Sequence, residues 1–406
     1  MINALRNSEG EQMKIRSVLI MTGLCGFLGI FLFFPSAGAE ETASRPIALV
    51  GGTLIDGTGA LPVPDAVVIV KGDRIAAVGT AATLKIPEGA EVVNLQGATI
   101  LPGFINAHVH MAYNELFLEF WAQAGITTVR DLAAYPPYSS YASKDRLNLD
   151  PKNARLVASG PQMTAVNGFV PAGYPCSVFI GTPAEGVRQA NRILDEGADL
   201  LKIMIESNKY PPMPLECAKA VAETAHQRQK NVSIHVSLSR DIETALAAGA
   251  NDLAHMVVDE LPPNLARKVV EAGVYWTPTI EVWQGLGFGK IVLANLRRFV
   301  EAGGGSRVVL GTDFKGASFQ FELGMPMKEI NWMQEAGMTP MQIIVAATHN
   351  AADVCGLGQA LGTVAAGKFA DLLIVDGNPL TDLSCLTRVR LVMHSGQIIQ
   401  KTKNSP

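Results

Sequence analysis

Two histidines two residues apart end an apolar run about a quarter of the way along the chain. The run is Leu101–Val109, and it contains His108 and is followed by His110. In a β-strand, residues two apart project from the same face, so both imidazoles would converge on one point. Imidazole nitrogen binds zinc, and two imidazoles supply half of a tetrahedral shell. The spacing predicts a metal site at the end of this strand.

Four more side chains with ligand chemistry stand at or near the ends of separate apolar runs. They are Lys202, His235, His255 and Asp313. In a barrel of parallel strands, the carboxyl ends of the strands meet at one mouth, where the active site lies. We therefore predict one metal centre, with the ligands His108, His110, Lys202, His235, His255 and Asp313.

Lys202 is the most unusual of these residues, because Leu200, Leu201 and Ile203 around it are apolar. Burial of an unpaired ammonium is costly and lowers its pKa. An ammonium has no lone pair and cannot bind a metal. A neutral amine that takes up CO2 becomes a carbamate, whose two oxygens can bridge two cations. We predict this carboxylated lysine; the alternative is an ion pair with Asp199 or Glu206.

The predicted chemistry is metal-assisted hydrolysis. Two metal ions about 3.5–4 Å apart hold a bridging water and lower its pKa towards neutrality. One ion would be held by His108, His110 and Asp313, and the other by His235 and His255. Lys202 would bind both ions. Asp313 would orient the bridging hydroxide and, as general base, pass its proton to the leaving group. Zinc is the default metal, and two Zn²⁺ per chain are expected; iron, cobalt or manganese also suit these ligands.

The other histidines are interpreted as non-catalytic. We expect His226 to be solvated on a helix, and His349 and His394 to be structural. The dipeptide Arg130-Asp131 ends an apolar run, where an internal ion pair is the favoured role and a contact across the barrel mouth the alternative.

The middle of the chain alternates strand-like runs with segments of helical period, which over about 250 residues predicts a (β/α)8 TIM barrel. The strand candidates are Phe104–His110, Ile126–Leu132, Ala154–Ala158, Leu200–Ile205, Val232–Val236, Asp252–His255, Val274–Thr277 and Val308–Thr312. The helix candidates are Glu115–Ala124, Pro183–Glu196, Leu215–Gln229, Ile242–Ala248, Asn264–Ala272 and Lys290–Ala302. A doubly wound open sheet is the competing architecture, but the chain has no Gly-rich phosphate turn to support it.

Both ends of the predicted mature chain contain short β-rich runs separated by glycine turns. These runs are Ile47–Val50, Ala66–Val70, Ile75–Val78, Ala370–Val375, Val389–Met393 and Gln397–Ile399. We predict that residues 45–103 and 360–402 join into one small β domain, with the barrel of residues 104–359 inserted between them.

The N-terminus has the order of a secretory signal peptide. Lys14 and Arg16 precede the apolar stretch Ser17–Phe34, and Ala37-Gly38-Ala39 follows it. A positive region, an apolar region and a small-x-small cleavage site predict a signal peptide over residues 1–39, cleaved near Ala39. An uncleaved transmembrane anchor is the alternative. The mature protein is predicted to be periplasmic or secreted, with membrane contact only through this segment.

Composition restricts the class of protein further. With 48% hydrophobic and 17% charged residues, and Lys+Arg 33 against Asp+Glu 37, the chain is typical of a globular protein and has no basic patch for nucleic acid. Export exposes four cysteines to an oxidising compartment, where they allow three pairings or stay free thiols. These cysteines are Cys176, Cys217, Cys355 and Cys385. The oligomeric state is open and includes a homo-oligomer.

Together, six motifs resemble the amidohydrolase superfamily, and more narrowly its imidazolonepropionase-like members, which include exported Xaa-Pro and basic-residue dipeptidases. The motifs are Pro102–His110, Gly125–Asp131, Gly197–Lys202, Leu310–Asp313, Ala347–Ala352 and Gly367–Leu372. The resemblance implies a (β/α)8 barrel with a composite β-sandwich, and a binuclear centre in which carboxylated Lys202 is the bridge.

The chain departs from that family around the predicted pocket. Thr164–Phe169 lacks a histidine, Val236-Ser237-Leu238 replaces the usual His or Gly, Ala254 stands where an acid is common, and Glu206-Ser207-Asn208 replaces a Gly-rich segment. Six residues on predicted loops are candidates for a substrate carboxylate or aromatic group, or for plain loop surface. They are Tyr135, Tyr138, Tyr174, Tyr210, Lys209 and Lys315.

The leading prediction is an exported metal-dependent amidohydrolase that cleaves an amide bond of a small molecule, a dipeptide or an N-acyl amino acid. A lactonase or phosphotriesterase-like esterase would use the same centre on an ester. Without carboxylation of Lys202, a mononuclear deaminase or cyclic amidase is favoured. A non-catalytic binding protein that keeps the fold is the remaining alternative.

Overall fold

The computed structural model describes residues 45–133, 140–170, 177–316 and 321–402. The predicted signal peptide, Cys176 and the tyrosines Tyr135, Tyr138 and Tyr174 lie outside the described residues. No helix in the described ranges is long and apolar enough to cross a membrane.

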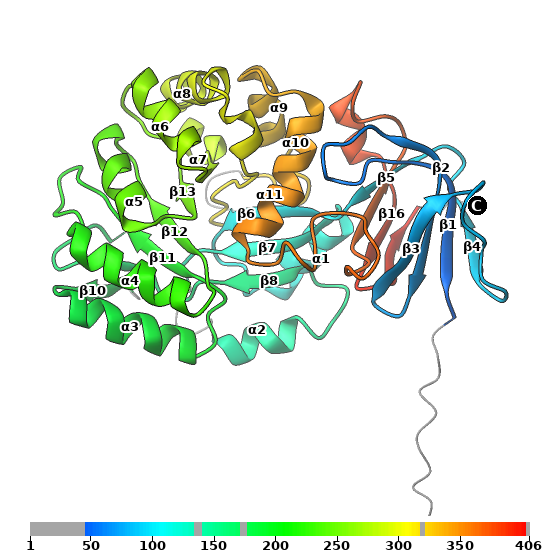
Figure 1. The fold of residues 1–406 in the computed structure, drawn as a ribbon, viewed down its shortest axis with the longest axis horizontal. Helices are drawn as coiled ribbons and strands as arrows, with labels where there is room; N and C mark the ends of the chain where they lie inside the picture. Colours follow the sequence, from blue (N-terminus) through cyan, green and yellow to red (C-terminus); the bar gives the residue numbers. More distant parts are fainter. Residues whose placement is uncertain (1–44, 134–139, 171–176, 317–320, 403–406) are drawn as a thin grey trace, which may run out of the picture. The chain divides into compact units, whose positions relative to one another are not determined.

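The middle of the chain consists of parallel strands that alternate with helices (Figure 1). One parallel sheet has the order β6-β7-β8, and its strands are β6 (Phe104–Val109), β7 (Ile126–Asp131) and β8 (Arg155–Ala158). The second has the order β10-β9-β11-β12-β13-β14, with β9 (Met163–Ala165), β10 (Val178–Ile180), β11 (Leu201–Met204), β12 (Val232–His235), β13 (Asp252–Ala254) and β14 (Tyr275–Thr277). From β9 and β11 to β14 the order advances without reversal, unlike a doubly wound sheet.

The eighth predicted strand, Val308–Thr312, is not a regular strand. Isolated parallel bridges join Val308 to Trp276 of β14 and Phe314 to Val109 of β6, so the segment between them links the two sheets. The expected barrel is therefore seen only in part, because the assigned strands form two parallel sheets instead of one closed ladder.

Helices cover the outer side of the strands (Figure 1). They are α1 (Glu115–Gln123), α2 (Tyr141–Leu147), α3 (Pro183–Asp195), α4 (Leu215–Gln227), α5 (Ile242–Ala248), α6 (Pro263–Glu271), α7 (Ile280–Gly285), α8 (Gly289–Glu301), α9 (Met327–Glu335), α10 (Pro340–Ala347) and α11 (His349–Val354). Capping side chains determine where several of these helices begin. The Thr182 side chain caps α3, and Thr339 and Gln342 form a capping box at α10.

Strands from both ends of the chain share one mixed sheet, with the order β17-β16-β15-β5-β1-β2-β3 and β4 paired to β1. These strands are β1 (Ile47–Leu54), β2 (Val63–Lys71), β3 (Arg74–Thr80), β4 (Glu91–Asn94), β5 (Thr99–Pro102), β15 (Leu372–Val375), β16 (Val389–His394) and β17 (Gln397–Lys401). The antiparallel pairing of β5 with β15 joins the two ends. Residues 44–406 form one compact unit, so the domain boundaries drawn above stay a prediction.

The core has two main parts. One lies between the parallel strands and their helices and includes Phe104, Trp121 and Trp276, all fully buried. The other lies on the mixed sheet, around Leu49, Ile100 and Leu372. Among the described residues, the cysteines are free and buried; they are Cys217, Cys355 and Cys385.

Candidate active site

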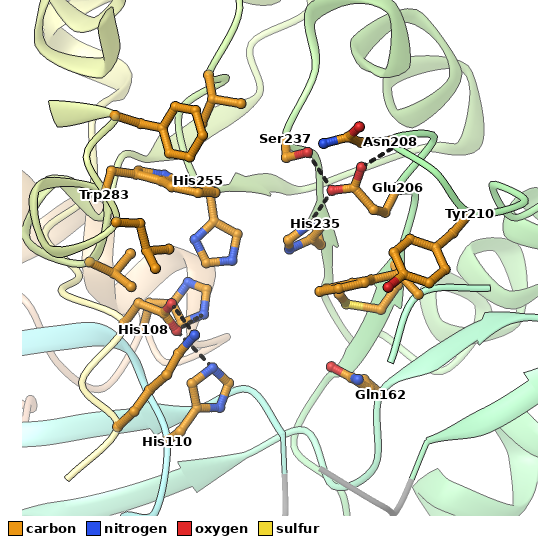
Figure 2. A pocket seen from close by; sticks show the side chains of 18 of the residues that line it. His108, His110, Gln162, Glu206, Asn208, Tyr210, His235, Ser237, His255 and Trp283 are labelled. Atoms are coloured by element: carbon orange, nitrogen blue, oxygen red, sulfur yellow. Dashed lines mark hydrogen bonds and ion pairs between the residues drawn. The ribbon is translucent and has the colours of Figure 1, made fainter. Parts of the chain in front are cut away.

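A cavity of about 360 Å³ lies where the parallel strands end, and all six predicted ligands line it. Figure 2 shows the imidazoles of His108, His110, His235 and His255 around it, with Glu206 and Ser237 next to His235. His255 connects the histidines, because its ring centroid lies 4.6 Å from that of His108 and 4.7 Å from that of His235. The structure therefore brings together residues that are up to about two hundred positions apart in sequence.

His108, His110 and Asp313 form the tightest group, with ligand atoms within 4.8 Å of one another. Asp313 Oδ1 lies 2.8 Å from His110 Nε2 and 3.3 Å from His108 Nε2. All three side chains are buried. Within the described residues this is the one group of three histidine, cysteine or carboxylate ligands close enough to hold an ion.

The backbone around Asp313 explains how it reaches β6. The amide of Asp313 donates to the carbonyl of His108 (2.8 Å), and Asn106 Nδ2 donates to Thr312 Oγ1 (3.0 Å). The close approach requires Gly311, because a Cβ there would lie 2.4 Å from Thr277 and 2.8 Å from the His108 side chain. Thus the motif Gly-Thr-Asp serves packing as well as chemistry.

His255 and Asp313 both have left-handed backbone, with φ of +73° and +59°. Such conformations are uncommon outside glycine and cluster at functional sites. Thr279 (φ +50°) shares this strain and places its Oγ1 2.8 Å from His255 Nδ1. The contact leaves Nε2 of His255 as the nitrogen available to a ligand.

Lys202 on β11 is 2% exposed, and its Nζ has no hydrogen-bond partner among the described residues. Neither alternative ion pair forms, because Asp199 pairs with Lys144 (2.9 Å) and Glu206 with His235 (3.2 Å). Burial, opposed by Asp252 and assisted by the Arg130 guanidinium, lowers the pKa of Lys202 to about 7. An amine in this state has a lone pair to react with CO2.

The charge state of the site suits a cation. Burial would raise the pKa of Asp313, but Lys315, whose Nζ lies 2.9 Å from Oδ2, and His110 outweigh it and hold that pKa well below its usual range. Burial lowers the pKa of His108 and His255, so both are neutral. His108 Nδ1 and Lys202 Nζ lack hydrogen bonds within the described chain. A buried set of nitrogen and oxygen lone pairs with so few partners fits a bound metal.

The rest of the cavity wall is mostly apolar and aromatic. Its side chains include Phe169, Met204, Val258, Val282, Trp283, Leu286 and Phe288. Three of the six proposed substrate contacts, Lys209, Tyr210 and Lys315, also line it. Sequence reasoning missed Trp283 and Thr279 because they follow the seventh strand, which carries no predicted ligand.

The other three histidines lie outside the cavity lining. His226 on α4 is exposed, and His394 on β16 is buried with Nδ1 2.8 Å from the carbonyl of Pro151. His349 begins α11, its Nε2 3.7 Å from Asp353. Arg130 does make an internal ion pair, but with Asp252 across the interior and not with its neighbour in sequence.

Comparison with known proteins agrees with this geometry. Residues 99–399 match the sequence profile of the amidohydrolase family. The ochratoxinase of Aspergillus niger is 25% identical to this chain over 89% of the chain and 87% of its own length, and the enamidase of Eubacterium barkeri is 24% identical over 87% and 95%. The structure of a Xaa-Pro dipeptidase with bound methionine, 22% identical, superposes with a TM-score of 0.75 and covers 87% of this chain and 99% of that one.

The chain therefore belongs to the amidohydrolase family. It is an enzyme of a family in which the matched relatives are named as hydrolases and deaminases that act on carbon–nitrogen bonds. The resemblance inferred from the six motifs is confirmed.

Proposed function

We propose that this protein is a two-metal amidase that hydrolyses the amide bond of a dipeptide or an N-acyl amino acid. The observation that carries the proposal is the position of all six ligand candidates on one buried cavity, with Lys202 Nζ unpaired among the described residues. The ochratoxinase, the enamidase and the Xaa-Pro dipeptidase among its relatives support carbon–nitrogen bond cleavage.

Two groups of residues would hold the metals. His108, His110 and Asp313 already converge, and His235, His255 and Lys202 line the same cavity. Lys202, once carboxylated, would supply oxygen ligands to both groups. When bound, the metals supply Lewis-acid polarisation of the substrate carbonyl and a water nucleophile at neutral pH.

Asp313 is suited to move the proton. Lys315 pairs with Oδ2, whereas Oδ1 faces His108 and His110. Oδ1 would accept a proton from the attacking water and deliver it to the amine as the carbon–nitrogen bond breaks. The low pKa of Asp313 keeps it ionised at neutral pH.

The cavity favours a small substrate with an apolar part. A volume of about 360 Å³ is at the lower end of the range for small-molecule sites, which suits a dipeptide-sized ligand and excludes a folded protein. Trp283 and Phe288, with ring centroids 5.9 Å apart, offer an aromatic wall for the acyl group. Lys209 at the rim offers a cation for a substrate carboxylate.

The test is elemental analysis of protein purified without chelator, combined with a substrate screen. About two zinc equivalents, release of amino acids from aromatic N-acyl amino acids or dipeptides, and little activity on matched esters are expected. Asp313→Asn should lose turnover, whereas Asp145→Asn at an exposed carboxylate should not. Cleavage of esters or lactones alone would refute the proposal of an amidase.

A one-metal deaminase or cyclic amidase is the second candidate. It is favoured by the observation that His108, His110 and Asp313 form the one compact three-ligand group in the described chain. Deaminases are also among the relatives. One metal equivalent, together with ammonia release from amino-purines or opening of cyclic amides, would establish this alternative.

We also propose that the enzyme works outside the cytoplasm, from the signal-like order of residues 1–39. N-terminal sequencing of protein from the periplasmic or culture fraction should begin shortly after Ala39. Full-length protein retained in the cytoplasm would exclude export.

A further inference from the structure

The residues around Glu206 departed from the family pattern in sequence, and in the structure they form a small polar cluster at the cavity. Glu206 follows β11 and is 6% exposed; His235 ends β12, and Ser237 lies two residues beyond it. Figure 2 shows the Glu206 carboxylate between His235, Ser237 and Asn208. None of these contacts was expected from the order of residues along the chain.

Donors hold both oxygens of Glu206. The backbone amide of Asn208 donates to Oε1 (2.7 Å), and Ser237 Oγ donates to Oε2. The same Oε2 lies 3.2 Å from His235 Nε2. With its two oxygens occupied, Glu206 is fixed beside the imidazole and not directed at the centre of the cavity.

These contacts determine which nitrogen of His235 carries the proton. A carboxylate only accepts hydrogen bonds, so Nε2 of His235 must be the donor, and the lone pair of the neutral ring is then on Nδ1. Histidines that bind metals usually donate their other N–H to a carboxylate or carbonyl, and loss of that partner weakens metal binding. Thr279 Oγ1 plays the corresponding part at Nδ1 of His255.

We propose that Glu206 is a positioning residue that orients His235 to bind the second metal through Nδ1, so that the affinity of this one site depends on Glu206. The inference rests on the two-metal centre proposed above. By this proposal Glu206, which departs from the family pattern, has a role in the metal site itself. In the described residues, Glu206 makes no hydrogen bond or ion pair with the first site, which is formed by His108, His110 and Asp313.

The experiment is a zinc titration of the full-length protein against a chelating dye, for wild type, Glu206→Gln and Glu206→Ala. The first equivalent should bind equally in all three. The second should weaken by about 10- to 100-fold in Glu206→Ala and by less in Glu206→Gln, whose amide oxygen still accepts from Nε2. Glu223→Gln and Glu223→Ala are matched controls on the surface of α4 and should bind like wild type.

The outcomes separate this inference from the proposed function. Two tight equivalents in Glu206→Ala would overturn the positioning role alone, and so would equal losses in the Gln and Ala variants, which indicate direct ligation. One equivalent in wild type would overturn both proposals. Nitrogen-15 NMR of histidine-labelled zinc-bound protein gives an independent readout: the proton of His235 should be on Nε2, and a proton on Nδ1 would refute the assignment.

Discussion

Replacement of Arg130 by Met should destabilise the fold more than any surface change. Arg130 and Asp252 are both 0% exposed, and the guanidinium binds the carboxylate through two nitrogens, at 2.9 and 2.8 Å. Arg130 also donates to the carbonyls of Ala107 on β6 (2.5 Å) and Val354 on α11 (3.0 Å). The side chain therefore ties together both parallel sheets and α11.

The magnitude follows from the charge that the substitution leaves behind. Removal of one partner of a buried ion pair costs about 3–5 kcal/mol, because the other charge stays buried without compensation. Unfolding entropy is about 2.1 cal/mol/K per residue, or roughly 0.75 kcal/mol/K for the compact unit 44–406. The expected fall in Tm for Arg130→Met is therefore about 4–7 °C.

The assay is differential scanning calorimetry of metal-free protein, with two comparisons. Arg192→Met removes an exposed ion pair, with Glu196 at 2.7 Å, and should change Tm by less than about 1 °C. The double variant Arg130→Met with Asp252→Leu should recover at least half of the loss, because no unpaired charge remains. The reasoning would be refuted if Arg130→Met lowered Tm by less than about 1 °C. It would also be refuted if the decrease in Tm of the double variant equalled the sum of the decreases in the two single variants.

Three further predictions concern the site, its wall and a buried carboxylate on α7. Asp313→Asn should lower kcat by about 10²–10⁴-fold in steady-state assays; unchanged kcat would exclude it as the base. Phe288→Ala should raise KM about three- to tenfold for substrates with aromatic acyl groups and leave acetyl substrates unaffected; equal effects on both would remove Phe288 from the acyl site. Burial raises the pKa of Glu281 to about 7, so the folded protein holds a proton that the unfolded chain releases above about pH 4.5. The free energy of unfolding of the protein should therefore fall by about 3 kcal/mol between pH 4.5 and 7 and then level off. Urea titrations of Glu281→Gln at the same pH values should lack this part of the pH dependence.

Sequence was informative wherever one local pattern decided the structure. The predicted runs Phe104–His110 and Val232–Val236 differ by one residue from β6 and β12, because apolar content and strand length are local properties. Val308–Thr312 has the same composition but is not a regular strand, since its place between β14 and β6 depends on Gly311 passing the Thr277 side chain. Such a contact between distant segments leaves no periodic signal.

The candidate site was likewise predictable from sequence only in part. Its ligand types were predictable because each ends its own apolar run. The contacts that orient His235 and His255 were not, because they come from separate elements: Glu206 after β11 for His235, and Thr279 before α7 for His255. Each partner lies close to a ligand candidate in space, but residues of these types have many other roles in proteins. Residue type alone therefore does not predict these contacts.

Hydrogen bonds to the backbone of the site explain how it can tolerate its strained conformation. His255, Asp313 and Thr279 all have positive φ, each at a cost of about 1–3 kcal/mol, and such strain persists only where surrounding contacts determine the conformation. The amide of Asp313 is held by the His108 carbonyl, and the His255 carbonyl accepts from Trp276 Nε1 (2.6 Å). The ligands are thus aimed at the cavity by the protein's own hydrogen bonds, so a cation that binds there meets lone pairs already in place. Binding of the cation would then require little rearrangement of the protein. A low cost of rearrangement distinguishes a tight catalytic site from a chance cluster of histidines.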